Sequence, residues 1–277
     1  MKFLDSNIIK LLKENEFNFC KHWNSLNLNI EKKFFTLYSD EFSDDYFISR
    51  TVTNENFEFK NEDELEKNVN LLINTYKNKK IFLHLPSNQT VLEKYLIKRK
   101  FPKIDEVIGL QYPFFSTSNL LDFEYLKTEF SKNVFQRIFI LDSVEQLNQW
   151  INTYCSSFEI SFDKRRIIYK ILKEKFDLFY FIISRIYCKN MPFANVAGCC
   201  ILFSYKSCIA MYCLGTKKKY RNRNVARNII DFAIRFAQRK GYQIFGLQTL
   251  QSDSLVPFYE KKGFIKIYTN NIYQLAL

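Results

Sequence analysis

The stretch LGTKKKYRNRNVARNII, residues 214–230, carries six lysines and arginines and no carboxylate. An apolar pattern with helical spacing begins at its end, at Val225. The first backbone N–H groups of a helix have no partner within the helix, and the helix dipole adds about half a positive charge there. A basic loop that leads from a strand into a helix N-terminus is therefore suited to bind an anion.

The surrounding charge supports this reading. The net charge is +12, and the segment from Leu178 to Ile230 contains no Asp or Glu but nine lysines and arginines. Such an uneven distribution indicates an anionic partner for this part of the chain. Nucleic acid, a membrane surface and a phosphorylated cofactor all fit at this point.

The composition predicts a folded protein. The chain has 277 residues, of which 47% are hydrophobic and 17% aromatic, enough for one large or two ordinary cores. No apolar run approaches the roughly 20 residues that cross a bilayer, and the first 20 residues lack a signal-peptide core. We expect a cytoplasmic protein that is not bound to a membrane.

Cysteine and histidine offer little for metal or nucleophile chemistry. The seven cysteines form no C-x-x-C pair and lie mostly in apolar runs, at positions 20, 155, 188, 199, 200, 208 and 213. We expect them to pack as small hydrophobic residues. His22 and His84 are far apart, so neither a zinc site nor a histidine triad is expected, and His84 is read as a core or edge residue of a strand.

The second half of the chain has clear secondary-structure patterns. The expected helices are 142–155, capped by Asp142 or Ser143, then 162–175, 225–240 closed by Gly241, and 254–262 ended by Gly263. The expected strands are 133–141, 178–187, 195–205, 207–216 and 242–250, followed by a hairpin turning at Asn270–Asn271. A tight turn at Lys206 joins the third and fourth strands. The order predicts an α/β fold with a mixed, mostly antiparallel central sheet flanked by helices.

At this point the residues resemble a known family. The stretch 214–230, then YQIFGLQT and PFYEKKGF, is similar to the GNAT superfamily of acyl-CoA-dependent N-acyltransferases. Its phosphate-binding motif is Arg/Gln-x-x-Gly-x-Gly/Ala, and Arg221, Asn222, Arg223, Asn224, Val225 and Ala226 occupy the six positions. The resemblance covers residues 133–277, which we expect to form a GNAT acetyltransferase domain.

The resemblance implies a site for acetyl-CoA, with coenzyme A as the product. The diphosphate would lie on the N–H groups of the loop, the pantetheine would run along Leu214, Gly215 and Thr216, and Arg227 and Ser252 would border the cofactor. Asn224 stands where the family has glycine, and Asn222 where a second glycine is common. Asparagine is the non-glycine residue that best tolerates the left-handed conformation, so we expect the loop to keep its shape.

The resemblance also places a catalytic tyrosine at Tyr259, whose hydroxyl would protonate the leaving thiolate. The alternative is a core tyrosine beside Phe258 and Phe264. Ser252 and Asp253 are expected to cap the helix of Tyr259. No carboxylate lies on the central strands, so Tyr212 and Gln248 could order a water, and Glu159 is the nearest candidate base.

The first half resembles a degenerate copy of the second. It shows an expected helix at 61–78, a strand at 80–86, a helix at 90–100, a strand at 106–114 and a polar connector at 115–133. Tyr95 falls near the place of Tyr259, and Lys98-Arg99-Lys100-Phe101 matches Lys261-Lys262-Gly263-Phe264. No phosphate loop precedes residue 80. We therefore expect two tandem GNAT-like domains, residues 1–132 without a cofactor loop and residues 133–277 with one. The alternative for the first half is an unrelated α/β extension.

Three functions remain after these observations. The first is N-acetyl transfer from acetyl-CoA to a primary amine of a small molecule or peptide, by direct attack. The second is a catalytically inactive binding module of the same fold. The third is an aminoacyl transferase resembling the Fem-type enzymes that use charged tRNA. The cofactor reading makes a nucleic-acid partner unexpected, and the oligomeric state is open.

Overall fold

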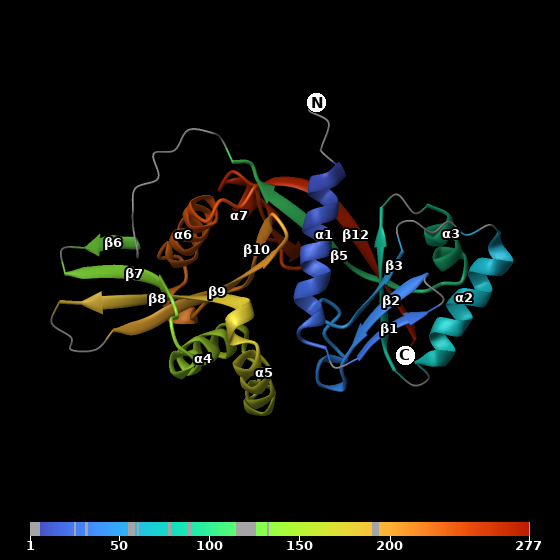
Figure 1. Ribbon diagram of the computed structural model, residues 1–277, viewed down its shortest axis with the longest axis horizontal. Helices are drawn as coiled ribbons and strands as arrows, with labels where there is room; N and C mark the ends of the chain where they lie inside the picture. The colour runs from blue at the N-terminus through green and yellow to red at the C-terminus, as the bar shows by residue number, and fades with distance from the viewer. Residues whose placement is uncertain are drawn as a thin grey trace. The chain divides into compact units, whose positions relative to one another are not determined.

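A computed structural model describes residues 6–24, 26–30, 33–54, 59, 61–76, 79–87, 90–114, 126–131, 133–189 and 194–276. The chain forms two compact units from interleaved segments (Figure 1). Unit 1 consists of Met1–Asn15, Gln111–Leu247 and Lys262–Ile265, and unit 2 of Glu16–Leu110, Gln248–Lys261 and Lys266–Leu277. The division into domains at residue 132 stays a prediction.

The sheet of unit 1 has the strand order β11-β10-β9-β8-β7-β6. The strands are β6 (Leu126–Ser131), β7 (Val134–Ile140), β8 (Phe179–Cys188), β9 (Asn195–Tyr205), β10 (Cys208–Thr216) and β11 (Ile244–Leu250). Neighbours are antiparallel except β10 and β11, which are parallel. The five strands predicted in this half are confirmed, as is the tight turn at Lys206, which has a φ of +54°. The predicted connector 115–133 is wrong for residues 126–131, which form β6.

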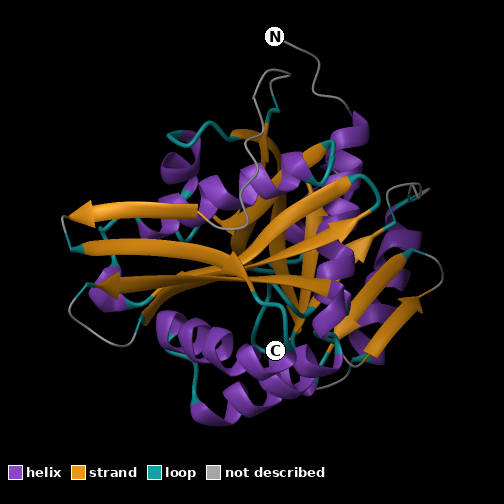
Figure 2. Cartoon of the chain, turned by 60° about the vertical axis from the view of Figure 1, so that its left-hand side comes forward, coloured by secondary structure: helices purple, strands orange, loops and turns teal. Residues whose placement is uncertain are grey.

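Helices flank this sheet, as Figures 1 and 2 show. Helix α6 (Val225–Arg239) covers one face, and α4 (Leu147–Phe158) with α5 (Phe162–Glu174) covers the other. The helices approach the sheet closely at two glycines. A Cβ on Gly198 would meet Ile229 of α6, and a Cβ on Gly215 would lie 2.8 Å from Cβ of Ser157 in α4. The mixed α/β class predicted from the sequence is confirmed.

The start of α4 differs from the prediction. A 3₁₀ turn, η2 (Val144–Gln146), precedes the helix, and Ser143 is the N-cap of that turn without a side-chain hydrogen bond. The N-cap of α4 itself is Gln146. Two further turns, η3 (Phe176–Leu178) and η4 (Lys218–Tyr220), lead into β8 and α6.

The sheet of unit 2 has the strand order β1-β2-β3-β4-β12-β5. The strands are β1 (Leu26–Ile30), β2 (Phe34–Tyr38), β3 (Arg50–Thr53), β4 (Ile81–Pro86), β5 (Lys103–Tyr112) and β12 (Ile265–Ala276). Strands β3 and β4 are parallel, like β10 and β11 in unit 1. The predictions of β4 and β5 are confirmed. Strands β1 to β3 were not predicted, although residues 26–30 alternate strictly between apolar and polar side chains.

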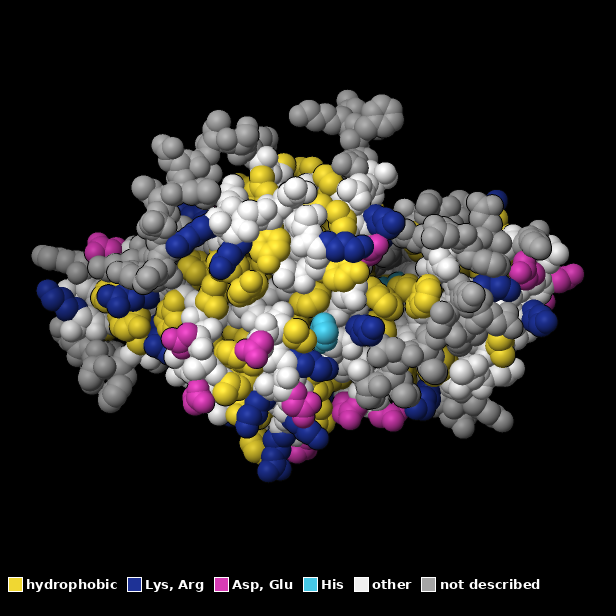
Figure 3. Space-filling model, viewed as in Figure 1, with side chains coloured by type: hydrophobic (Ala, Val, Ile, Leu, Met, Phe, Trp, Pro, Cys, Tyr) yellow, Lys and Arg dark blue, Asp and Glu magenta, His cyan; other side chains and the backbone are white. Residues whose placement is uncertain are grey.

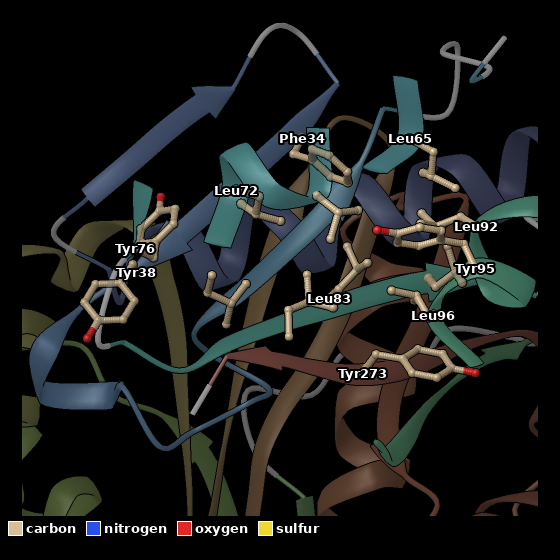
Figure 4. Packing of buried hydrophobic residues seen from close by; sticks show 14 residues of the cluster. Phe34, Tyr38, Leu65, Leu72, Tyr76, Leu83, Leu92, Tyr95, Leu96 and Tyr273 are labelled. Atoms are coloured by element: carbon tan, nitrogen blue, oxygen red, sulfur yellow. The ribbon is translucent and has the colours of Figure 1, made fainter. Parts of the chain in front are cut away.

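The helices of unit 2 enclose its main core. Helix α2 (Glu62–Thr75) connects β3 to β4, and α3 (Thr90–Lys98) connects β4 to β5. Their apolar faces pack on the sheet through Leu65, Leu72, Leu92 and Leu96, which surround Leu83 of β4 (Figure 4). A turn, η1 (Asp40–Phe42), precedes β3. Both predicted helices are confirmed.

Two predictions near the end of the chain are wrong. The expected hairpin at Asn270–Asn271 does not exist, because β12 is one strand that continues through both residues and pairs with β4. Ser252 and Asp253 do not cap a helix, because α7 (Val256–Glu260) begins later and its N-cap is Leu255.

Candidate active site

The loop between β10 and α6 has the conformation expected of a glycine loop although it contains no glycine. Asn222 has a φ of +60° and Asn224 a φ of +57°, both in the left-handed region. Asparagine tolerates this region better than other residues with a side chain. The expectation that both asparagines can replace glycine in this backbone path is confirmed.

The N-terminus of α6 leaves its first donors available. Asn224 is the N-cap, and its side chain makes no capping hydrogen bond. Its carbonyl accepts from the N–H of Asn228 at 2.9 Å, which begins the helical ladder. The first turn contains no acidic residue but includes Arg227, which is exposed. The backbone N–H groups of residues 225–227 thus lie in a positive environment suited to an anion.

Arg221 anchors the loop instead of extending from it. Its Nε donates to the carbonyl of Thr216 at 3.2 Å, and its Nη2 donates to the carbonyl of Ser157 at 2.9 Å. The guanidinium therefore ties the loop to the end of β10 and to α4. Arg223, two residues later, is exposed and has the freedom to meet a ligand.

The three lysines before Arg221 have different surroundings. Lys218 forms an ion pair with Glu159, and this contact lowers the pKa of Glu159. Burial, and then the charge of Lys219, lowers the pKa of Lys217. Glu159 is therefore an exposed carboxylate engaged in an ion pair with Lys218, and a role as the proton acceptor stays a prediction.

The end of β10 is irregular where the resemblance puts the pantetheine. The register shifts between Tyr212 and Gly215, and Cys213 in this bulge has a φ of +55°. The parallel pairing with β11 runs from Cys208 to Met211. Leu214, Gly215 and Thr216 follow the bulge, and the Thr216 hydroxyl is buried without a hydrogen-bond partner among the described residues. A buried orphan hydroxyl beside the loop is suited to a polar group of a ligand.

The side chain of Tyr212 on β10 is hydrogen-bonded within the protein, and those of Cys199 and Cys200 on β9 are buried as neutral thiols. The hydroxyl of Tyr212 donates to Oδ1 of Asn15 at 2.7 Å, so its proton is not available to order a water. Cys199 and Cys200 are fully buried, and burial raises their pKa well above the usual value. Five of the seven cysteines are buried and all are free thiols, as expected for packing residues.

Tyr259 belongs to unit 2, in helix α7. It is 5% exposed, and its ring meets that of Phe258 edge-on at 5.2 Å. Ser252, which precedes this helix, donates its hydroxyl to Asp105 at 2.6 Å. The roles predicted for Tyr259 and Ser252 toward acetyl-CoA stay predictions.

Unit 2 also contains a buried polar chain that the sequence did not reveal. Gln248 donates to the hydroxyl of Tyr268 at 3.0 Å, and Tyr268 donates to Oε2 of Glu16 at 2.7 Å. Glu16, which is 2% exposed, pairs with Arg50 at 2.6 Å. One feature of the sequence could have indicated this polar chain: Glu16 lies on the apolar face of α1 (Ser6–Lys21), between the buried Leu12 and Phe19.

His84 is a buried core residue of β4, as expected, but only one of its ring nitrogens is satisfied, because Nδ1 is buried without a hydrogen-bond partner among the described residues. It is 1% exposed, and its Nε2 lies 2.7 Å from the carbonyl oxygen of Tyr46. Burial, and then the charge of Arg50, lowers its pKa well below the usual value. Among the described residues, no group of acidic, cysteine or histidine side chains could hold a metal ion. No described helix has the length and hydropathy to span a membrane.

Comparison with known proteins agrees with this geometry. Residues 183–266, which run from β8 into β12, match the sequence model of the acetyltransferase (GNAT) domain. No curated protein sequence matches the chain. The matched segment contains the whole loop, both parallel strands and α7.

Solved structures of similar fold extend over nearly the whole chain. A GCN5-related N-acetyltransferase from Kribbella flavida aligns with a TM-score of 0.62 at 12% identity, covering 99% of this chain and 96% of its own. One from Sphaerobacter thermophilus aligns with a TM-score of 0.62 at 9% identity, covering 98% and 91%.

A tandem GNAT protein of the clavulanic acid biosynthesis pathway aligns with a TM-score of 0.55 at 7% identity, covering 82% of this chain and 75% of its own. At these identities the likeness is one of fold. The fold likeness to a tandem protein is consistent with two GNAT-like parts, and the boundary between them stays a prediction.

Proposed function

We propose that this chain, whose residues 183–266 match the sequence model of the GNAT acetyltransferase domain, transfers the acetyl group of acetyl-CoA to a primary amine. Coenzyme A would supply an activated acyl thioester. The acceptor would be the amine of a small molecule or a peptide, and a cytoplasmic location is part of the proposal.

The observation that carries the proposal is the loop from Arg221 to Ala226. Two left-handed asparagines lead into a helix N-terminus that has no side-chain cap and no acidic residue in its first turn. The positive helix end and the exposed Arg223 and Arg227 fit a diphosphate. The hydroxyl of Thr216, which is buried without a hydrogen-bond partner among the residues that the structure describes, fits a polar group that arrives with the ligand.

In this proposal, separate residues bind the diphosphate, position the pantetheine and transfer the proton. Residues 222–227 bind the diphosphate through backbone N–H groups and two guanidinium groups, while Arg221 holds the loop on α4. The backbone of residues 214–216 positions the pantetheine. Tyr259 donates a proton to the sulfur as the carbon–sulfur bond breaks and the amine nitrogen forms the amide bond. The proton that the amine loses goes to solvent.

Two measurements test the proposal. A ligand at about 100 times its dissociation constant stabilises a protein by about 2.7 kcal/mol, so acetyl-CoA should raise the melting temperature clearly. Thiol release with a panel of amines then tests transfer. A thermal shift without thiol release for any amine would favour the inactive binding module, and no shift would remove the cofactor site.

The role of Tyr259 has its own test. Tyr259→Phe keeps the ring and removes the hydroxyl, so it should lower turnover by about 10²-fold or more with little change in the affinity for acetyl-CoA. Phe258→Leu, on the same helix, is the matched control and should keep the rate. An unchanged rate in Tyr259→Phe would leave the tyrosine a packing role only.

A further inference from the structure

Strands β7 and β8 of unit 1 present a row of aromatic and basic side chains on one face. The register pairs Phe135 with Tyr187 and Arg137 with Arg185. Arg137 has a second partner on its other side, because Lys127 of β6 stands opposite it. Three cationic residues therefore follow one another across three neighbouring strands. We call Arg137 and Arg185 the arginine pair.

The aromatic rings are arranged around the guanidinium groups. The rings of Phe135 and Tyr187 stack with centroids 5.1 Å apart and planes inclined by 4°. The Arg137 guanidinium carbon lies 5.4 and 5.3 Å from these two ring centroids. The Arg185 guanidinium carbon lies 4.6 Å from the ring of Phe139, and its Nη2 donates to Gln149 at 2.7 Å.

The two faces of these strands differ in burial. Gln136 and Ile138 are buried on the side of α6, where Asn228 donates to Gln136 at 2.6 Å. Phe135 and Arg137, which alternate with them along β7, are partly exposed, and so are their cross-strand partners Tyr187 and Arg185. In Figures 1 and 2 the ends of these strands extend past the flanking helices. Figure 3 shows dark blue basic side chains beside yellow ones at this left-hand end.

Like charges directly opposite each other on neighbouring strands destabilise a sheet. Acidic residues on these strands do little to neutralise the opposed cations. Glu129, which pairs with Phe135, is the only acidic residue among the described residues of β6, β7 and β8. Lys189, exposed just after β8, adds another cation. An arrangement of this kind is favourable when an anion lies over it.

We propose that the face formed by the arginine pair, Phe135 and Tyr187 binds single-stranded nucleic acid. Guanidinium groups bind phosphates in a fork geometry, and flat side chains on a sheet face offer surfaces on which bases stack. The net charge of +12 draws such a ligand to the protein. This function goes beyond acetyl transfer and does not depend on it.

The chemistry of the face favours nucleic acid over an acidic peptide. A polyglutamate segment would use the cations but not the stacked rings, whereas a nucleotide uses both. The sequence suggested nucleic acid only for the segment around the basic loop and did not indicate this face, because Arg137 and Arg185 are 48 positions apart and meet only through the register of β7 with β8.

Fluorescence anisotropy with a labelled twelve-nucleotide oligouridine tests the proposal. The double variant Arg137→Gln, Arg185→Gln should weaken binding about tenfold or more at low salt. Each phosphate contact to a single strand contributes about −0.7 to the slope of log K against log salt, so the slope should become less negative by about 1.4. Arg137→Lys with Arg185→Lys keeps the charge and should lose less affinity.

The matched control removes the same charge elsewhere in unit 1. Lys164→Gln with Arg166→Gln, on the exposed side of α5, should leave RNA binding unchanged. Circular dichroism melting of both double variants reports their folding, and the loss of opposed charges should leave the arginine variant as stable as the wild type.

Three results would overturn the proposal. The first is no binding of the RNA at low ionic strength, and the second is an equal loss in both double variants. The third is that a twelve-residue polyglutamate binds as tightly as the RNA and that the arginine variant weakens this binding as well. That result would assign the face to an acidic protein. If the glutamine pair does not fold, the lysine pair and single Arg185→Gln decide.

Discussion

Helices α6 and α2 hold corresponding places in the two units, yet their N-termini are built differently. Each connects two parallel strands, β10 to β11 in unit 1 and β3 to β4 in unit 2. Each has asparagine as its N-cap. Asn61 of α2 is extended, with a φ of −157°, and its side chain accepts from the N–H of Glu64 at 2.8 Å. Asn224 of α6 is left-handed and makes no such bond.

The first turns of the two helices also differ in charge. The first turn of α2 contains Glu62, Asp63 and Glu64, whereas that of α6 contains no acid. Helix α2 thus satisfies its own N-terminus with a side chain and neutralises its dipole with carboxylates. Helix α6 has neither the side-chain cap nor the carboxylates, so its N-terminus keeps the positive potential that suits an anion. One residue type gives opposite results because its backbone conformation differs.

The largest expected effect comes from giving α6 the acidic first turn of α2. Ala226→Asp with Arg227→Glu should weaken acetyl-CoA binding about 100-fold, or about 2.7 kcal/mol, because two carboxylates would face the diphosphate. Isothermal titration calorimetry measures the change. The protein should still fold, since acidic residues stabilise a first turn.

A control for this variant lies at the other end of the same helix. Gln238→Asp with Arg239→Glu changes the net charge by the same amount in the last turn. It should destabilise the helix slightly and keep the affinity for acetyl-CoA within about threefold. If both variants lost affinity equally, the N-terminus of α6 would not be the binding site.

A smaller effect, on the free energy of unfolding, is expected at Asn224, where the left-handed backbone matters more than the side chain. A left-handed conformation costs a residue with a Cβ roughly 1–2 kcal/mol, while glycine adopts it freely. Asn224→Ala should therefore lower the free energy of unfolding by about 1 kcal/mol relative to Asn224→Gly, as urea denaturation measures. Equal stabilities would mean that the loop does not need the left-handed position.

The smallest effect is expected at Asn61, where the side chain and not the backbone conformation matters. Asn61→Ala should cost about 1 kcal/mol of stability, and Asn61→Gly only a few tenths. Acetyl-CoA affinity should stay unchanged in both variants. A loss of affinity on changing Asn61 would contradict the assignment of the site to α6 alone.

Local sequence signals predicted much of this architecture. The apolar stripe of α6, the turn at Lys206 and the buried run of β4 each depend on neighbouring residues, so their patterns survive in the sequence. The left-handed Asn222 and Asn224 could also be predicted, because the motif fixes where a glycine-like conformation is needed.

Other features depend on partners far apart in the chain. Glu16 and Tyr268 are 252 positions apart and meet only in the folded unit 2. The hairpin expected at Asn270–Asn271 followed from turn propensity, but pairing of Asn270 with Pro86 and of Asn271 with Leu85 keeps this segment extended. The burial of Tyr259 likewise reflects tertiary packing that no local pattern shows.

The long strand β12 has a consequence for biosynthesis. Strand β4 is complete once residue 86 has been made, but its antiparallel partner spans Asn270 to Ala276. At about 5–20 residues per second, a ribosome needs some ten seconds or more to supply that partner. Until then β4 presents unpaired backbone groups and a cluster of apolar side chains, so the nascent chain passes through a period in which chaperones would recognise it.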